Sequence, residues 1–172
     1  MAKLKREALL SFLDSAWHAH YAEVTEQSAA SWVVIGDDIE DMAIELNPDT
    51  EQIKNILGQS KVRDNGYEPS FDADPFYADP DNALYPKIRD IALERKQGDD
   101  CKTLLLEVII EDTEATSHKA FVREVFVKPQ SYGGDTSGVN IPYTVTEDGK
   151  NIEGTVTAAS VLAGAPVFTA TT

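Results

Sequence analysis

The stretch Gly36–Asp81 reads GDDIEDMAIELNPDTEQIKNILGQSKVRDNGYEPSFDADPFYADPD and carries thirteen acidic and three basic residues. Its local net charge of −10 is two thirds of the chain's −15. The stretch is nevertheless patterned for folding, because Met42, Ile44 and Leu46 occupy every second position, which is typical of a strand with one buried face. The sequence therefore predicts a strand over residues 41–46.

A polar arm is expected to follow at residues 48–68. Asn47-Pro48-Asp49 is turn chemistry that ends the preceding strand. Thr50–Gly58 and Ser60–Asp64 then form the two limbs of a hairpin, and Asp64-Asn65-Gly66 marks another tight turn. Because a two-stranded arm is not stable alone, it needs a partner surface. The apolar residues with which it can hold such a surface are Ile53, Ile56 and Leu57.

Composition favours one acidic globular domain spanning residues 1–172. The chain is 42% apolar and 26% charged, which suits a single domain with a substantial core. Thirty acidic residues against fifteen basic ones repel a phosphate backbone. This balance disfavours a DNA or RNA reader but is compatible with a protein that lies close to DNA without binding it. The one cysteine, Cys101, cannot form an internal disulfide, and no apolar run predicts a membrane-spanning helix.

The remaining pattern is mainly β. Within residues 1–30, Lys5–Ser15 fits neither the helical nor the strand period cleanly, and a strand is favoured over a short helix. An irregular connection is expected to follow, and Trp32–Ile35 is a further short strand. Lys102–Glu111 is apolar on both faces, which predicts a central strand covered twice. Lys119–Pro129 is expected to pair with it.

One helix is predicted over Asp81–Lys96, with Asp81 as N-cap and Gly98 as the C-terminal stop. Because proline is accepted only in the first turn of a helix, Pro86 favours a start nearer Leu84. Helical spacing predicts one buried stripe. Its members are Leu84, Ile88, Ile91 and Ala92.

The C-terminal third predicts a hairpin and a tail. Asp-Gly between alternating runs is a strong hairpin signal, so Asn140–Thr146 and Lys150–Ala158 are expected to pair over Glu147-Asp148-Gly149. Ser131–Gly138 is expected to be a loop and residues 159–172 a loosely ordered tail. Together the elements predict a mainly β fold, a two-sheet β-sandwich or barrel with one flanking helix.

Residues that could carry chemistry do not form a convincing site. His18 and His20 could be two ligands of a metal ion, but zinc needs three or four, and His118 and Cys101 stand apart in the sequence. The acids Asp72, Asp74, Asp79 and Asp81 lack the glycine and the closing glutamate of a calcium loop.

An acid pair of the glycosidase kind could be drawn from Glu107 and Glu124, although with thirty acids such pairs arise by chance. The glycine-rich segment Ser131–Gly138 has no GK[ST] ending and opens no predicted helix, so it is not expected to cradle phosphate. The sequence predicts no enzyme, with no catalytic residue, no cofactor and no metal.

Resemblance to a known family rests on three segments: IGDDIEDMAIELNPDTEQIKNILG (35–58), DNGYEPSFDADPFYADPDNALYPKIRDIALER (64–95) and VKPQSYGGDTSGVNIPYTV (127–145). In this order and spacing they resemble the major tail tube protein of long-tailed bacteriophages of the non-contractile, siphovirus type. The resemblance runs from about Trp32 to about Thr157.

The resemblance implies a structural virion protein of the tail tube fold, with a long protruding hairpin arm. Six copies would form a ring, and rings would stack into a tube with an acidic lumen through which the genome passes. The implied partners are further copies of the chain, the tape measure protein, and the distal tail and tail terminator proteins, with transient, non-sticking passage of DNA and no membrane. The implied location is the virion tail, and the host cytoplasm during assembly.

The resemblance also assigns residues to two surfaces. Candidate acids of the lumen or its rim are Asp37, Asp38, Glu40, Asp41 and Glu45. Within residues 48–68, which correspond to the family's loop toward a neighbouring ring, the candidate contacts are Asp49, Glu51, Lys54, Lys61, Arg63 and Asp64.

An alternative from another class is a β-sandwich module of a virion that binds carbohydrate or a receptor. Aromatic residues clustered with prolines would then form a stacking platform, although such a cluster more often closes one end of a sandwich. These residues are Tyr67, Phe71, Phe76 and Tyr77.

Overall fold

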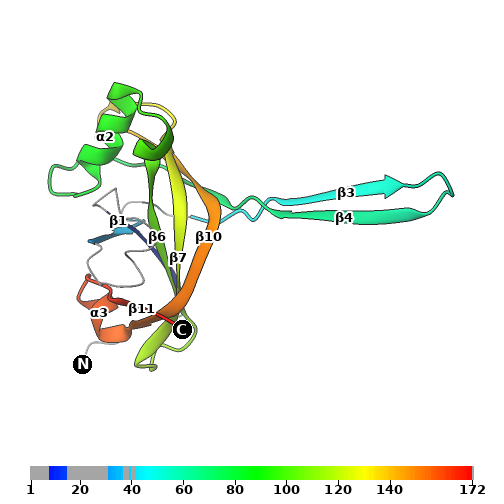
Figure 1. The fold of residues 1–172 in the computed structure, drawn as a ribbon. Helices are drawn as coiled ribbons and strands as arrows, with labels where there is room; N and C mark the ends of the chain where they lie inside the picture. The colour runs from blue at the N-terminus through cyan, green and yellow to red at the C-terminus, as the bar shows by residue number, and fades with distance from the viewer. Residues whose placement is uncertain (1–7, 15–30, 37–38, 40–41, 172) are drawn as a thin grey trace.

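A computed structural model of the chain describes residues 8–14, 31–36, 39 and 42–171 (Figure 1). Within these residues the protein is mainly β with few helices, as predicted. Seven strands form one antiparallel sheet in the order β11-β10-β7-β6-β1-β2, with β5 also pairing with β10. The sheet strands are β1 (Ala8–Asp14), β2 (Trp32–Ile35), β5 (Ser70–Ala73), β6 (Lys102–Ile110), β7 (Ser117–Pro129), β10 (Tyr143–Thr157) and β11 (Phe168–Ala170).

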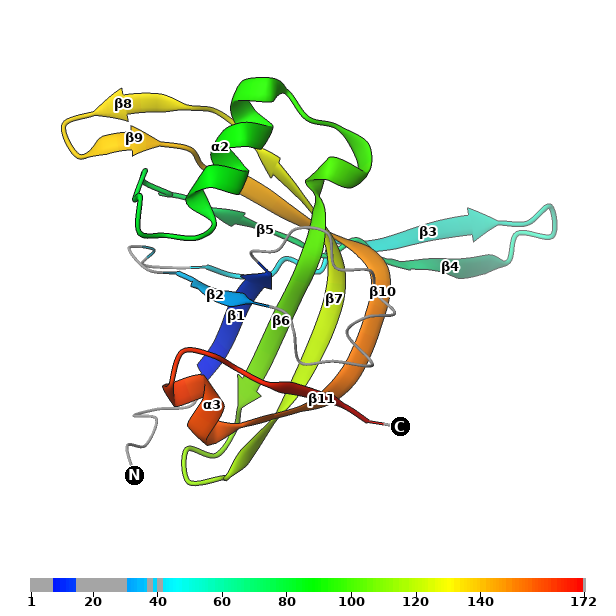
Figure 2. The same cartoon turned by 60° about the vertical axis from the view of Figure 1, so that its left-hand side comes forward.

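The sheet curls, and smaller elements lie at its two ends (Figure 2). The seven strands thus form one curled sheet rather than the two packed sheets expected from the sequence. Outside this sheet, the described residues also form two separate hairpins and three helical segments. They are β3 (Pro48–Lys54) with β4 (Ser60–Tyr67), β8 (Gly133–Asp135) with β9 (Gly138–Asn140), α2 (Tyr85–Glu94), the 3-10 helix η1 (Gly98–Cys101) and α3 (Ala158–Leu162).

Two cores lie on opposite faces of this sheet. Leu105 packs in the core under α2, whereas Leu104 and Leu106 pack in the core beside α3 and β11. Because successive side chains of a strand point to opposite faces, β6 contributes to both cores, as expected for a strand covered twice. The α2 core also contains Ile88 and Tyr143, and the α3 core contains Val122 and Phe168.

The helix α2 is shorter than predicted. It begins after Leu84, as Pro86 indicated, and not at Asp81, and Pro86 lies in its first turn, where a missing N–H costs nothing. It ends at Glu94, and Arg95, with a left-handed φ of 57°, caps it in place of the predicted Gly98. The apolar stripe is confirmed, since Leu84, Ile88 and Ile91 are buried and Ala92 packs against them.

The strand predicted over residues 41–46 is wrong for the part described. Residues 42–47 contain no strand, and only Glu45 forms a bridge, to Ser70. Met42 and Ile44 still pack against the α2 core, whereas Leu46, the third member of the predicted buried face, is 56% exposed. Pro48 does not end a strand but begins β3, a position where proline costs no ladder hydrogen bond.

Two Asx-Gly turn signals are bulges, not turns. Asp49 pairs with Gly66 and Thr50 with Asp64, so Asn65 is an extra residue inside β4. Likewise β10 is one strand that pairs with β7 along its length, with residues 148–150 bulging between Glu147 and Asn151. The hairpin predicted over Glu147–Gly149 is therefore wrong, because the long strand β7 offers pairing partners on both sides of the Asp-Gly signal.

The last residues are part of the fold. The side chain of Thr157 caps α3 by accepting a hydrogen bond from the Ser160 N–H, and β11 pairs with β10. Val161 and Phe168 are buried, so the tail predicted for residues 159–172 is an ordered element of the α3 core over its described part. The predicted loop Ser131–Gly138 likewise contains β8 and the start of β9.

The strand expected within Lys5–Ser15 is confirmed as β1, and Trp32–Ile35 as β2. The predicted irregular connection that contains His18 and His20 lies outside the described residues. Among the helices described, none is long and apolar enough to cross a membrane.

Candidate functional site

The β3–β4 hairpin projects away from the sheet as a free-standing arm (Figure 1). Every residue of β3 is exposed, and so is every residue of β4 except the partly buried Gly66. Cross-strand pairing aligns Glu51 with Arg63, Ile53 with Lys61 and Lys54 with Ser60. All six candidate arm residues therefore lie on this hairpin, exposed to solvent.

The end of the arm is an ordered turn that presents apolar side chains. The Asn55 carboxamide oxygen accepts hydrogen bonds from the N–H groups of Leu57 (3.0 Å) and Gln59 (2.9 Å). The Asn55 Nδ2 group donates to Gln59 Oε1 at 3.0 Å, and the Gly58 N–H donates to the Asn55 carbonyl at 3.0 Å. These bonds fix the turn while Ile56 and Leu57 remain 103% and 77% exposed.

The base of the arm is ordered by a second asparagine. Asn47 adopts a left-handed conformation with φ 42°, and its Nδ2 group donates to the Glu68 carbonyl at 3.1 Å and to Ser70 Oγ at 3.1 Å. Leu46 and Tyr67 are exposed beside it. The sequence predicted a turn at Asn47 but assigned no role to Asn55, although both follow the known preference of asparagine for turns.

Of the candidate lumen acids, the structure places one. Glu45 is exposed, and its backbone exchanges two hydrogen bonds with Ser70 at 2.8 and 2.9 Å. The other four, Asp37, Asp38, Glu40 and Asp41, lie outside the described residues.

The aromatic residues of the alternative site do not share one exposed surface. Phe71 is buried in the α2 core, and Phe76 packs edge-on against Tyr143 with ring centroids 5.2 Å apart. The Tyr77 hydroxyl lies 3.4 Å from Asp135 on the β8–β9 hairpin, and Tyr67 is exposed at the end of β4. These positions match the closing of one end of the sheet better than a stacking platform.

The acids Glu107 and Glu124 lie on opposite faces of the sheet. Glu107 pairs with Phe121 across β6 and β7, whereas Glu124 pairs with Leu104, three positions away from Glu107 on β6. Because an odd separation reverses the side-chain direction, the two carboxylates cannot act on one substrate from the same side. Each has its own cation, Arg123 for Glu107 and Lys102 for Glu124.

A mostly buried ion cluster was missed by sequence reasoning. Arg123 Nε donates to Glu107 Oε2 at 3.0 Å, and Arg123 also lies 3.5 Å from Glu147 Oε2. Burial raises the pKa of Glu147, Arg123 opposes the shift and Glu107 adds to it. The three residues come from β6, β7 and β10, so no local sequence signal could have grouped them.

Among the residues described, no group of three or more His, Cys, Asp or Glu side chains could hold a metal ion. His118 and Cys101 are both buried, in β7 and at the end of η1.

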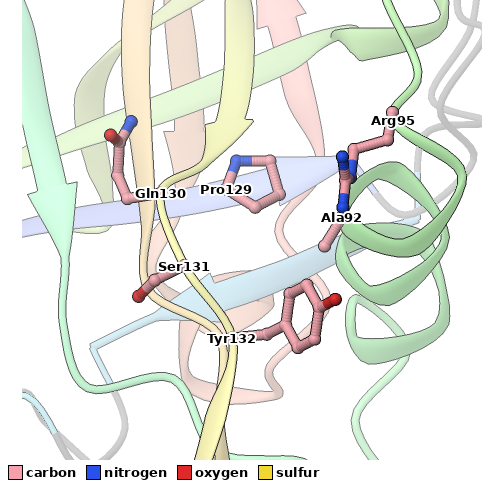
Figure 3. A pocket seen from close by; sticks show the side chains of 6 residues that line it. All are labelled: Ala92, Arg95, Pro129, Gln130, Ser131 and Tyr132. Atoms are coloured by element: carbon pink, nitrogen blue, oxygen red, sulfur yellow. The ribbon is translucent and has the colours of Figure 1, made fainter.

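One open pocket of about 290 Å³ lies between the end of α2 and the chain after β7. Figure 3 shows Pro129 and Tyr132 on the side that faces Ala92 and Arg95, with Gln130 and Ser131 on the other side of the chain. Among the described residues that line it, none is acidic.

No known family model matches the chain, and a search of curated proteins found no relative.

Proposed function

We propose that this protein is a structural virion protein that assembles into stacked hexameric rings, the tail tube of a long-tailed bacteriophage. The tube is a passive conduit with an acidic lumen through which the genome passes during ejection. The proposal starts from the resemblance of residues 35–58, 64–95 and 127–145 to tail tube proteins, and three features of the molecule support it.

The arm is the observation that carries the proposal. A polar two-stranded hairpin is marginal by itself in water. The turn of this one is held by the hydrogen bonds of Asn55, yet the hairpin leaves Ile53, Ile56 and Val62 exposed. A partner molecule that covers these side chains stabilises the arm, and a neighbouring ring is such a partner.

Open sheet edges are the second support. Within the described residues β2 pairs with β1 on one side only, and β5 and β11 cover only the two ends of β10. Unpaired edge groups are a template for pairing with another chain. Identical neighbours in a closed ring satisfy such edges without leaving any exposed.

Charge is the third support. A net charge of −15 disfavours phosphate contacts within the screening length of about 8 Å at physiological salt. An acidic wall therefore keeps DNA mobile in a channel. We assign this wall to Asp37, Asp38, Glu40, Asp41 and Glu45.

Negative-stain electron microscopy of the purified protein at rising concentration tests the assembly. Rings that stack into tubes of uniform diameter are expected, and a chain that stays monomeric at every concentration contradicts the proposal. Lysine substitutions of the wall acids test the conduit. They should leave tubes intact and slow genome ejection, and unchanged ejection from such particles rejects the acidic-lumen mechanism.

A further inference from the structure

The arm is electrically polarised along its length. We define its tip as residues 53–61 and its root as residues 45–50 with residues 64–68; between the two, Glu51 lies directly across from Arg63. The tip carries two basic side chains and no acidic one, and the root carries four acidic side chains and no basic one. The tip cations are Lys54 and Lys61, and the root acids are Glu45, Asp49, Asp64 and Glu68.

The two ends are also matched in their apolar side chains. The tip exposes Ile56 and Leu57, and the root exposes Leu46 (56%) and Tyr67 (63%). Each end is held in shape before any partner arrives, the tip by Asn55 and the root by Asn47. Preorganisation of this kind lowers the entropic cost of association.

The tip lysines lie too far from the root acids of their own chain to neutralise them. Lys54 is five residues from Asp49 along β3, roughly 17 Å, and Lys61 is three residues from Asp64 along β4, roughly 10 Å, and both distances exceed the screening length of about 8 Å. Figure 1 shows the arm pointing away from the rest of its own chain. The complementary surface for each end therefore belongs to another molecule.

We propose that the tip of one copy docks on the root of a second copy, with Ile56 and Leu57 against Leu46 and Tyr67 and the tip lysines against the root acids. Because the two surfaces differ, the contact is heterologous and repeats from copy to copy without closing on itself. This proposal rests on the proposed function, for which it names the contact that stacks one ring on the next.

A different polyanion fits the tip less well. Two lysines make a weak phosphate site, and a phosphate backbone offers nothing for two exposed aliphatic side chains to bury against. The root of a second copy supplies both the carboxylates and the apolar surface.

A binding assay on the full chain tests the contact. Ser60→Cys places a thiol on the tip, where it can be labelled with an environment-sensitive fluorophore, because Cys101 is buried. The labelled chain is kept at trace concentration and titrated with unlabelled wild-type protein. A saturable blue shift that weakens between 0.05 and 0.5 M NaCl (roughly, Debye lengths of ~14 and ~4 Å) is expected.

A charge-swap cycle makes the assay specific. A labelled chain with Lys54→Glu and Lys61→Glu should bind the wild-type protein with an affinity at least about tenfold below that of the labelled chain with the wild-type tip. The labelled chain with the wild-type tip should lose affinity by a similar factor for protein carrying Asp49→Lys and Glu68→Lys. The reversed tip with the reversed root should recover affinity to within roughly threefold of wild type. Lys87→Glu/Arg95→Glu on the labelled chain changes the net charge equally, away from the arm, and should bind as wild type.

Each outcome decides. Tip-to-root docking is overturned if reversing the tip charges leaves the binding affinity unchanged, or if the reversed tip binds the reversed root as weakly as it binds wild type. If tubes form in either case, the proposed function still stands. Specific tip binding without rings supports the contact and rejects the tube. Absence of both a blue shift and rings rejects both.

Discussion

Arg123 Nε lies 3.0 Å from Glu107 Oε2, and this ion pair joins β7 to β6 in the middle of the sheet. The same guanidinium reaches Glu147 on β10 at 3.5 Å. The side chains of Glu107 and Glu147 are only 7% and 11% exposed, so one cation compensates two largely desolvated carboxylates across three strands.

Replacing Arg123 by methionine should therefore be strongly destabilising. Removing one partner of a buried pair leaves an uncompensated buried charge, and the expected loss is about 3–5 kcal/mol of unfolding free energy. Urea denaturation at pH 7 measures it. Lys119→Met is the control, because its pair with Glu153 is about half exposed and should contribute at most about 1 kcal/mol. Equal losses for the two variants would contradict the role of burial.

Glu147 should make stability depend on pH. Burial, helped by Glu107 and opposed by Arg123, raises the pKa of Glu147 above its ordinary value of 4.5. The native state then binds this proton more tightly than the unfolded state, so the contribution to stability is present below 4.5 and is lost as pH rises through the raised pKa. The unfolding free energy of wild type, relative to that of Glu147→Gln, should therefore increase when the pH is lowered from 7 to 4. Parallel pH curves would refute this.

Gly154 should not tolerate a methyl group. A Cβ at this position would lie 2.2 Å from the Thr169 carbonyl oxygen and 2.6 Å from the Phe168 ring. The backbone carbonyl cannot move without breaking the β10–β11 pairing, so Gly154→Ala should cost on the order of 1–3 kcal/mol. Thermal unfolding measures the loss, and Gly133→Ala, which would meet no atom within 4 Å, should unfold close to wild type.

Ile88 should contribute strongly to the docking of α2. Its side chain is fully buried against the sheet, and Ile88→Ala should lower the unfolding free energy by about 2–5 kcal/mol through lost burial and the cavity left behind. Leu93 is on the same helix and 56% exposed, so Leu93→Ala should cost well under that. Denaturant titration of both variants makes the comparison, and similar midpoints would show that α2 is not held by this stripe.

Short apolar patterns predicted the elements of the sheet well. The two-sided run at Lys102–Glu111 is the central strand β6, and the helical stripe of α2 is buried as expected. The polar run at 48–68 is where the exposed β3–β4 hairpin lies. The partner surface of this hairpin, the hexameric ring and the acidic lumen stay proposals, because each depends on contacts between copies of the chain.

Asp-Gly and Asn-Gly predicted turns where the structure has bulges, for one physical reason. A glycine with positive φ serves a turn or a bulge equally well, and Gly149 and Gly66 have φ values of 78° and 98°. Which of the two forms depends on whether a strand is available to continue the pairing. At Gly149 that strand is β7, and its Arg123 pairs with Asn151 beyond the bulge.

The sequence alone determined that the chain is an acidic, mainly β protein, where its helix lies, and which side of most strands is apolar. These properties depend on neighbours within a few residues. The tertiary structure decided that β10 runs on past Gly149, that Glu107 and Glu124 face opposite sides, and that Arg123 gathers two distant carboxylates. Strand register sets all three, and register is fixed by burial summed over residues far apart in the chain.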